Sequence, residues 1–298
     1  MGLGTGDGPQ GRRAWKTRVL LYAVVGVVFV YSLWPILTMF LEGYNVDLGA
    51  VFAGKAIRFI GGLSYSGGIN PTPYYFLQAL GAEAYPRLAL NTLVVSALSI
   101  SIALAVGIPA AYALARLDVR GKTLVSYLLL ALRTVSQFVV IIPLYITYSA
   151  LGLYDTFPGI ALAEQMLILS VAVWMLKGFF ADVPRDVYEA ATLFGKREWQ
   201  TFRRVVLPMV APGIVVTTMF ALVLIWNDFL IADSLTGAAT KTVAVGVWEG
   251  LSITQLSFSA VTWNGLNAAG TLAYIPAMAV MLAVRKYLAR GFSLGLTD

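Results

Sequence analysis

The residues best placed to make a specific contact lie in a charge-rich segment between positions 184 and 208. A glutamate there offers a charge-assisted hydrogen bond, and two alanines beside it let a partner approach closely. These residue types suit a segment that docks on a partner protein. The simplest alternative interpretation of the segment is an ordinary surface hairpin. The pattern consists of Glu189, Ala190 and Ala191, then Gly195 after three residues, and finally Leu207 and Pro208.

Other reactive chemistry is scarce in the sequence. The chain has no cysteine and no histidine, which excludes thiolate and imidazole chemistry and the usual zinc or copper ligands. Residues 49–56 (GAVFAGKA) nearly match a phosphate-binding loop, but Ala56 lacks the hydroxyl that would ligate Mg²⁺. We therefore expect no catalytic residue, no metal site and no ATPase site in this chain.

Two short amphipathic helices around Gly195 are predicted to present the docking pattern. Asp182 is expected to cap the first helix, with Pro184 in its first turn. Gly195 is expected to adopt the left-handed conformation that ends a helix, and Pro208 is expected to end or kink the second helix. The first helix should bury a face made of Val187, Ala190, Ala191 and Phe194, and the second should align Trp199, Phe202 and Val206.

The composition shows what positions this segment. Of 298 residues, 59% are hydrophobic and 12% are charged, and the mean hydropathy is +0.78. A soluble domain carries roughly 25% charged residues, so we predict an all-α membrane protein with six transmembrane helices. The predicted order is a disordered N-terminal tail (1–16), a first span (17–41), an external loop (42–86) and a core domain (87–298) that holds spans at 88–114, 124–150, 160–180, 211–232 and 266–288, the loop 182–208 and an external segment 233–264.

The distribution of Lys and Arg predicts the orientation. With both termini and the 182–208 loop in the cytoplasm, the inner segments hold sixteen basic residues. The outer segments hold Lys55, Arg58, Arg87 and Lys241, and Arg133 lies within a span. This asymmetry fits the positive-inside rule. It also explains the net charge of +6 without a nucleic-acid partner.

The loop pattern resembles the EAA loop of permease subunits in binding-protein-dependent ABC importers. From about Tyr74 onward the chain is similar to the second permease of the maltose-type carbohydrate importers. The similarity is visible at residues 91–92 (NT), 110–122 (AAYALARLDVRGK), 142–145 (IPLY), 177–180 (KGFF), 226–229 (WNDF), 242–246 (TVAVG) and 285–291 (RKYLARG). Residues 46–68 and the C-terminal LGLTD depart from the family pattern.

The resemblance implies the rest of the machinery. Two ATP-binding subunits would hold ATP and Mg²⁺, and the 182–208 loop would dock on them as a coupling helix. A second homologous permease and an extracytoplasmic solute-binding protein would complete a multi-pass importer in the inner or plasma membrane. This chain would bind no cofactor itself, and it would work by alternating access.

Polar residues within the spans are the candidates for the substrate pathway, because a polar group facing lipid is costly. Sugar sites need aromatic faces and planar hydrogen-bonding groups. The candidates are Arg133, Gln137, Trp226, Asn227 and Asp228. The alternative is interhelical packing, for example an ion pair of Arg133 with Glu164 or Asp228.

Three other classes of protein stay open at the level of sequence. An ABC permease for another solute shares the loop. A secondary transporter acting alone would explain the spans but not the loop pattern, and no internal repeat is visible. An intramembrane enzyme would need clustered catalytic groups, and the carboxylates are scattered over different predicted helices.

Overall fold

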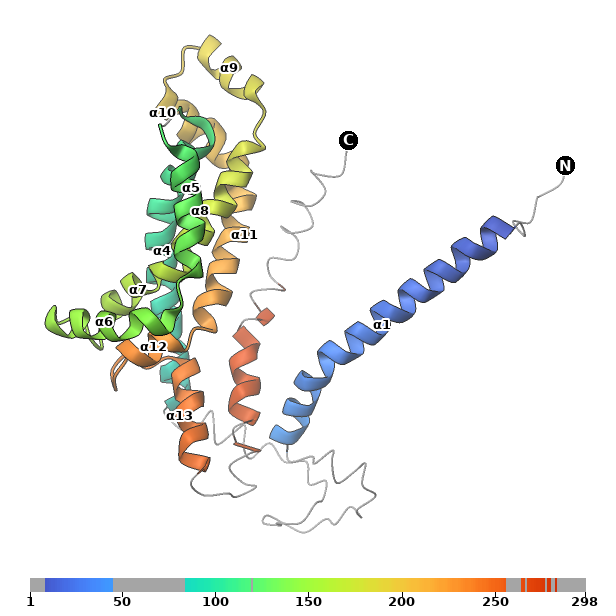
Figure 1. The fold of residues 1–298 in the computed structure, drawn as a ribbon, viewed down its shortest axis with the longest axis vertical. Helices are drawn as coiled ribbons and strands as arrows, with labels where there is room; N and C mark the ends of the chain where they lie inside the picture. The colour runs from blue at the N-terminus through green and yellow to red at the C-terminus, as the bar shows by residue number, and fades with distance from the viewer. Residues whose placement is uncertain are drawn as a thin grey trace. The chain divides into compact units, whose positions relative to one another are not determined.

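The computed structural model describes residues 9–44, 84–118, 120–255, 264–265, 267–276, 278–279 and 282. Within these ranges every regular element is a helix (Figure 1). The chain groups into two compact units, one formed by Met1–Ala79 with Phe258–Thr271 and the other by Leu80–Ser257 with Leu272–Asp298. The elements of the candidate site all belong to the second unit.

The described part of the first unit is dominated by α1 (Pro9–Gly43), a helix of 35 residues. Its apolar portion, Leu21–Glu42, is long enough to cross a membrane. Because α1 begins at Pro9, the prediction of a disordered tail is wrong for residues 9–16. Proline suits a first helical turn, where its missing N–H leaves no bond unmade. The side chain of Asn267 in the same unit donates to the Glu42 carboxylate at 2.8 Å.

Three long helices pack together in the second unit: α4 (Ala84–Arg116), α8 (Gln165–Ala181) and α11 (Leu207–Trp226) (Figure 1). Small residues let these helices approach, and a Cβ at Gly213 would overlap the Phe179 ring. One buried cluster lies toward the N-terminal half of α4 and includes Val95, Ile100, Ile160, Ile168 and Ile225. A second lies toward its C-terminal end and includes Ala111, Leu114, Leu176, Phe180, Phe202 and Val206.

Two of the predicted spans are broken. The helix expected over 124–150 is divided into α5 (Lys122–Thr134) and α6 (Gln137–Ala150), because Ser136 is extended at φ −66° and ψ 130°. The helix expected over 160–180 is preceded by α7 (Phe157–Ala163), which meets α8 at a bend of 52°. Thr156 starts α7 by accepting a hydrogen bond from the amide of Gly159 at 3.2 Å.

The fifth predicted span is shorter at its C-terminal end than expected. The helix expected over 211–232 ends at Trp226, and a separate short helix, α12 (Leu230–Leu235), follows. The segment 233–264 contains α13 (Val243–Gln255). The span expected over 266–288 lies partly outside the described residues. Its described residues, 267–276, 278–279 and 282, are helical.

The length and composition of the described helices support fewer spans than six. Three helices are long and apolar enough to cross a membrane, or four if α7 and α8 count as one bent span. The shorter apolar helices Lys122–Ala131 and Gln137–Ala150 fall below that length. The structure therefore shows an all-helical membrane fold, and the number of six stays a prediction.

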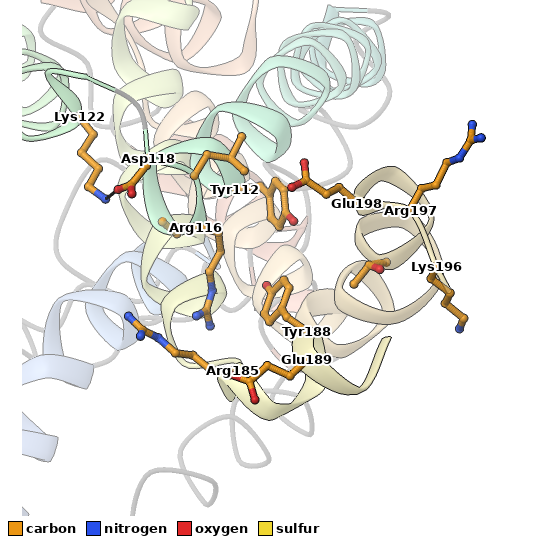
Figure 2. Close-up of a pocket in the computed structure, with 13 residues that line it drawn as sticks. Tyr112, Arg116, Asp118, Lys122, Arg185, Tyr188, Glu189, Lys196, Arg197 and Glu198 are labelled. Atoms are coloured by element: carbon orange, nitrogen blue, oxygen red, sulfur yellow. Dashed lines mark hydrogen bonds and ion pairs between the residues drawn. The ribbon is translucent and has the colours of Figure 1, made fainter. Parts of the chain in front are cut away.

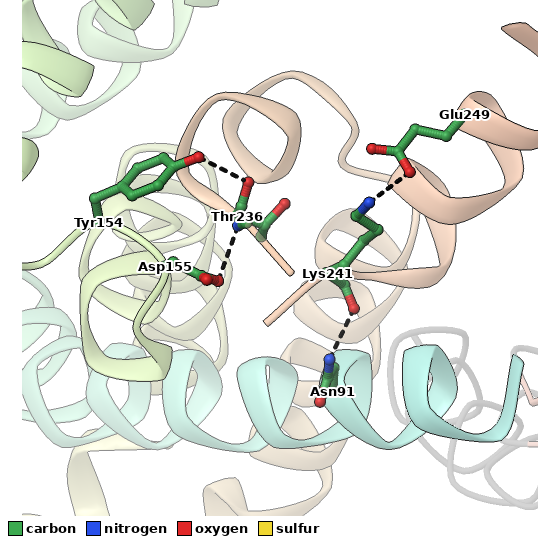
Figure 3. A network of polar contacts seen from close by, with 7 residues as sticks. Asn91, Tyr154, Asp155, Thr236, Lys241 and Glu249 are labelled. Atoms are coloured by element: carbon green, nitrogen blue, oxygen red, sulfur yellow. Dashed lines mark hydrogen bonds and ion pairs between the residues drawn. The ribbon is translucent and has the colours of Figure 1, made fainter. Parts of the chain in front are cut away.

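One end of the three-helix core holds a polar network around Asp155 (Figure 3). The Asp155 carboxylate accepts from the amides of Gly237, Ala239 and Thr240 at 2.8–3.2 Å and from the Thr240 hydroxyl at 2.6 Å. The Asn91 side chain of α4 donates to the carbonyls of Ala239 and Lys241. This Asp155 network ties the loop before α7 and the segment before α13 to the N-terminal part of α4.

Candidate functional site

The opposite end of the core holds α9 (Arg185–Leu193) and α10 (Glu198–Thr201), which lie beyond the ends of the long helices (Figure 1). Gly195 joins them with φ +70°, a left-handed conformation that favours glycine. The amide of Lys196 donates to the Ala191 carbonyl at 3.1 Å and so closes the end of α9. The prediction of two helices around a glycine is confirmed, and we call the segment Arg185–Thr201 the elbow.

The predicted ends of the elbow need correction. Asp182 terminates α8 at φ −74° and ψ −14°, so it does not cap α9. Pro208 does not end the second helix. A π-helical turn, Phe202–Val206, follows α10 and leads directly into α11, where Pro208 occupies the first turn. Proline has no backbone N–H to donate. The π-helical turn does not require one from Pro208, because the hydrogen bond that closes the turn runs from the Leu207 amide to the Phe202 carbonyl.

The apolar face of α9 is smaller than predicted, and the elbow exposes apolar side chains. Ala191 is buried and Val187 is partly buried, but Ala190 is exposed. Leu193 is 89% exposed and Phe194 is 84% exposed. The carboxylate of Glu189 is exposed as well. The elbow therefore presents the Glu189 carboxylate and the large apolar side chains of Leu193, Phe194 and Trp199, which its own chain leaves largely uncovered.

Arg116, the last residue of α4, holds the elbow to the core (Figure 2). Its guanidinium donates to the carbonyls of Phe180 at 2.9 Å and Ala181 at 3.1 Å, and also to the carbonyl of Val183. These carbonyls belong to the end of α8 and the chain just after it, where helix carbonyls lack intrahelical partners. The same guanidinium lies 4.8 Å from the ring centre of Tyr188 on α9.

A cavity of about 650 Å³ lies beside this arginine (Figure 2). Its lining comes from the end of α4, the start of α5, α9, the turn around Gly195 and α10, and it includes the polar residues Arg116, Lys122, Arg185, Tyr188, Glu189, Lys196 and Glu198. Burial raises the pKa of the Tyr188 phenol, although the Arg116 guanidinium opposes that shift. Tyr188 is therefore protonated at neutral pH, and the cavity combines a neutral phenol with charges of both signs.

Sequence reasoning missed the role of Arg116. The residue appears in the sequence as one of several basic residues after an apolar helix, which indicates only an interfacial charge. Its hydrogen-bond partners lie 64 to 67 positions away, so no local pattern points to them. The one available signal was that the arginine is the last residue of a long helix.

The structure brings together two of the five predicted pathway residues. Asp228 is buried and accepts from the Gln137 side chain at 3.3 Å. Its other oxygen accepts from the amides of Ile231 and Ala232 at the start of α12, each at 3.1 Å. Asp228 thus links the start of α6 to the start of α12, as the packing alternative requires.

The other three pathway candidates have different surroundings. Trp226 is buried, and its indole N–H donates to the Ala273 carbonyl at 2.9 Å. Asn227 is exposed and donates to the Val223 carbonyl at 2.8 Å. Arg133 is exposed in the last turn of α5. The alternative of an ion pair between Arg133 and Glu164 or Asp228 is wrong for the described structure, whose ion pairs involve other residues.

Comparison with known proteins gives consistent results. The profile of the family described as "Binding-protein-dependent transport system inner membrane component" matches residues 103–294. The trehalose transport system permease protein SugB of Mycobacterium tuberculosis is 33% identical over 291 residues, which cover 95% of this chain and 97% of SugB. The maltose/maltodextrin transport system permease protein MalG of Vibrio parahaemolyticus is 24% identical over 296 residues, which cover 95% of each chain.

A similar fold is found in a crystal structure of a bacterial ABC transporter that imports the acidic polysaccharide alginate. The two chains superpose with a TM-score of 0.70 at 18% identity, over 95% of this chain and 99% of the other. The helical core and the exposed elbow thus define a membrane protein of the ABC-importer type. The chain belongs to the family of binding-protein-dependent transport system inner membrane components. It is the permease component of such a system and not its ATPase.

Proposed function

We propose that this chain is the transmembrane permease subunit of an ATP-driven sugar importer and forms half of its translocation pathway. The observation that supports this most strongly is the 33% identity to a trehalose permease along nearly the whole of both chains. Relatives named for maltose and alpha-glucosides point to the same class of substrate. In this proposal the remaining parts are a second homologous permease, two ATP-binding subunits that hold ATP and Mg²⁺, and an extracytoplasmic solute-binding protein.

The elbow is the proposed contact with the ATP-binding subunits. Glu189, Ala190, Ala191, Gly195, Leu207 and Pro208 would act as one coupling unit. The exposed carboxylate of Glu189 would make a charge-assisted contact, and the exposed Leu193 and Phe194 would enter an apolar cleft. Arg116 would transmit the movement, because it joins α4 and the end of α8 to the Tyr188 ring of α9.

The orientation follows from charge. We propose six spans with the elbow and both termini in the cytoplasm. The predicted inner segments hold most of the basic residues, in agreement with the positive-inside rule. The Asp155 network lies at the opposite end of α4 from the elbow and would then lie on the external side, where a binding protein would dock (Figure 3).

Purification of the tagged chain from its native membrane tests this proposal. We expect an ATPase and a second permease to copurify, and the complex in liposomes to import trehalose or maltose only with ATP and the binding protein. A chain that purifies alone and moves solute without ATP would overturn the proposal in favour of a secondary transporter. An ATPase complex that imports phosphate, amino acids or peptides instead would keep the permease role and replace the sugar.

A further inference from the structure

A groove of about 410 Å³ runs along the surface of the core between α5, α8 and α11. Its lining includes Leu130 and Arg133 of α5, Ser170, Trp174 and Met175 of α8, and Phe220 of α11. Trp174 is 56% exposed and Phe220 is 47% exposed, so the groove presents two aromatic side chains outward. Arg133 is the one charged residue in this lining.

The depth of Arg133 makes its surroundings unusual. α5 begins at Lys122, whose ammonium pairs with the exposed Asp118 at 3.3 Å. Arg133 is eleven residues further along a helix that rises about 1.5 Å per residue, which places it roughly 16 Å deeper. That is about half of a ~30 Å hydrocarbon core. Among the described residues no carboxylate or carbonyl pairs with its guanidinium.

An unpaired guanidinium at this depth cannot face lipid without a large cost in free energy. The groove must therefore face either water or another polar surface. Ser170 adds a buried hydroxyl that has no hydrogen-bond partner among the described residues. The groove thus presents exposed aromatic side chains and a planar group with several donors above a buried hydroxyl.

We propose that this groove is the sugar-contacting surface of the chain. The Trp174 ring would stack on the C–H face of a sugar ring, and the Arg133 guanidinium would donate to its hydroxyl oxygens. Phe220 and Met175 would exclude water around the ring. The inference rests on the proposed role as a sugar permease and adds the residues that surround the substrate, of which sequence reasoning selected Arg133 but not Trp174, Phe220 or Met175.

The absence of native cysteine allows a direct test of water access. Met175→Cys and Phe220→Cys would be made in the assembled transporter, with Tyr127→Cys as the control, since Tyr127 is 67% exposed on α5 but does not line the groove. A membrane-impermeant methanethiosulfonate reagent should modify the groove cysteines at least roughly tenfold faster than the control, and trehalose or maltose with loaded binding protein should slow that reaction.

A second measurement separates substrate contact from packing. Trp174→Ala should raise the sugar concentration for half-maximal uptake roughly tenfold, while Trp174→Phe retains most of the affinity. Copurification of the ATPase and of the second permease shows whether each variant assembles. Suppose that the groove cysteines are modified as slowly as the control cysteine, in a complex that still hydrolyses ATP and imports sugar. That result would refute the proposed sugar contact of the groove and leave the proposed function standing. Loss of subunit assembly in Trp174→Ala would show a permease interface, and absence of a copurifying ATPase would refute the proposed function itself.

Discussion

The two ends of the three-helix core differ in whether their carboxylates are hydrogen-bonded within the chain or exposed. In the Asp155 network the carboxylate is fully used, with three backbone amides and a hydroxyl as donors within the chain. At the elbow the carboxylate of Glu189 is exposed beside two large apolar side chains that are more than 80% exposed. The first end is satisfied by its own chain, whereas the second retains groups that a partner can satisfy. Burial and hydrogen bonding thus distinguish the structural carboxylate of Asp155 from the exposed carboxylate of Glu189, which we propose contacts a partner.

Reversing the charge at the elbow should have the largest effect. Glu189→Lys is expected to reduce ATP-driven uptake to background, because an ammonium replaces the carboxylate proposed to contact the ATPase. The position is exposed, so the variant should reach the membrane at normal levels. Uptake in liposomes, together with the amount of copurified ATPase, measures this.

Glu198→Lys is the matched control for that experiment. Glu198 is also an exposed elbow glutamate, but it lies on α10 rather than α9. We expect it to retain most of the transport activity. Near-normal uptake by Glu189→Lys would refute the coupling role of α9, and equal loss in both variants would show that net charge rather than position matters.

Removing the guanidinium that holds the elbow should have the next largest effect. Arg116→Ala removes donors to three carbonyls and the contact with Tyr188, at a cost of about 2–3 kcal/mol in stability. The elbow should still bind the ATPase but transmit its movement poorly, so that more ATP is hydrolysed for each sugar imported. The ratio of ATP hydrolysis to uptake in liposomes measures this loss of coupling.

Two further variants identify which contact of Arg116 matters. Arg116→Lys keeps a cation at the end of α8 but cannot donate to several carbonyls at once. Its ratio of ATP hydrolysis to sugar uptake should therefore fall between those of the natural protein and Arg116→Ala. Tyr188→Leu removes the aromatic ring and leaves the carbonyl bonds in place. An unchanged ratio in Arg116→Ala, in a complex of normal stability, would restrict the arginine to a structural role.

The features that could be predicted from the sequence are those whose residues lie close together along the chain. The elbow was found because Gly195 and the amphipathic spacing of α9 lie within about ten residues of each other. The breaks at Ser136 and Glu164 were missed, since a run that is apolar on all faces has no periodicity to interrupt. The partners of Arg116 and Asp155 were missed for another reason, because they lie more than 60 positions away in the chain.

Neutralising the Asp155 carboxylate, at the end of the core opposite the elbow, should have a smaller effect. The effect is on the stability of the folded state, and it should depend on pH. Burial alone would raise the pKa of Asp155, but its hydrogen bonds with Thr240, Gly237 and Ala239 outweigh burial and lower the pKa below the ordinary value of an aspartate. The ionised group therefore stabilises the folded state above the unfolded-state pKa, and this contribution is lost as pH falls through the lower folded-state pKa.

Asp155→Asn should consequently lower the melting temperature at neutral pH, by the equivalent of about 1–2 kcal/mol. It should also make the melting temperature less dependent on pH below about pH 5, where the natural carboxylate is expected to lose its contribution as it becomes protonated. Thermal unfolding in detergent measures both effects, with Asp118→Asn at the elbow end as the control. A decline as steep in Asp155→Asn as in the natural protein would assign the acid sensitivity to other groups.

The smallest effect is expected at Trp226, the last residue of α11. The sequence placed this residue among the pathway candidates, whereas the structure shows a buried indole that donates to the Ala273 carbonyl at 2.9 Å. Trp226→Phe should therefore cost about 1 kcal/mol in stability, the value of one hydrogen bond. The sugar concentration for half-maximal uptake should stay unchanged, in contrast to the shift expected for Trp174→Ala. A shift as large in Trp226→Phe would restore Trp226 to the pathway, because a tryptophan used only for packing affects the folded state and not the affinity for sugar.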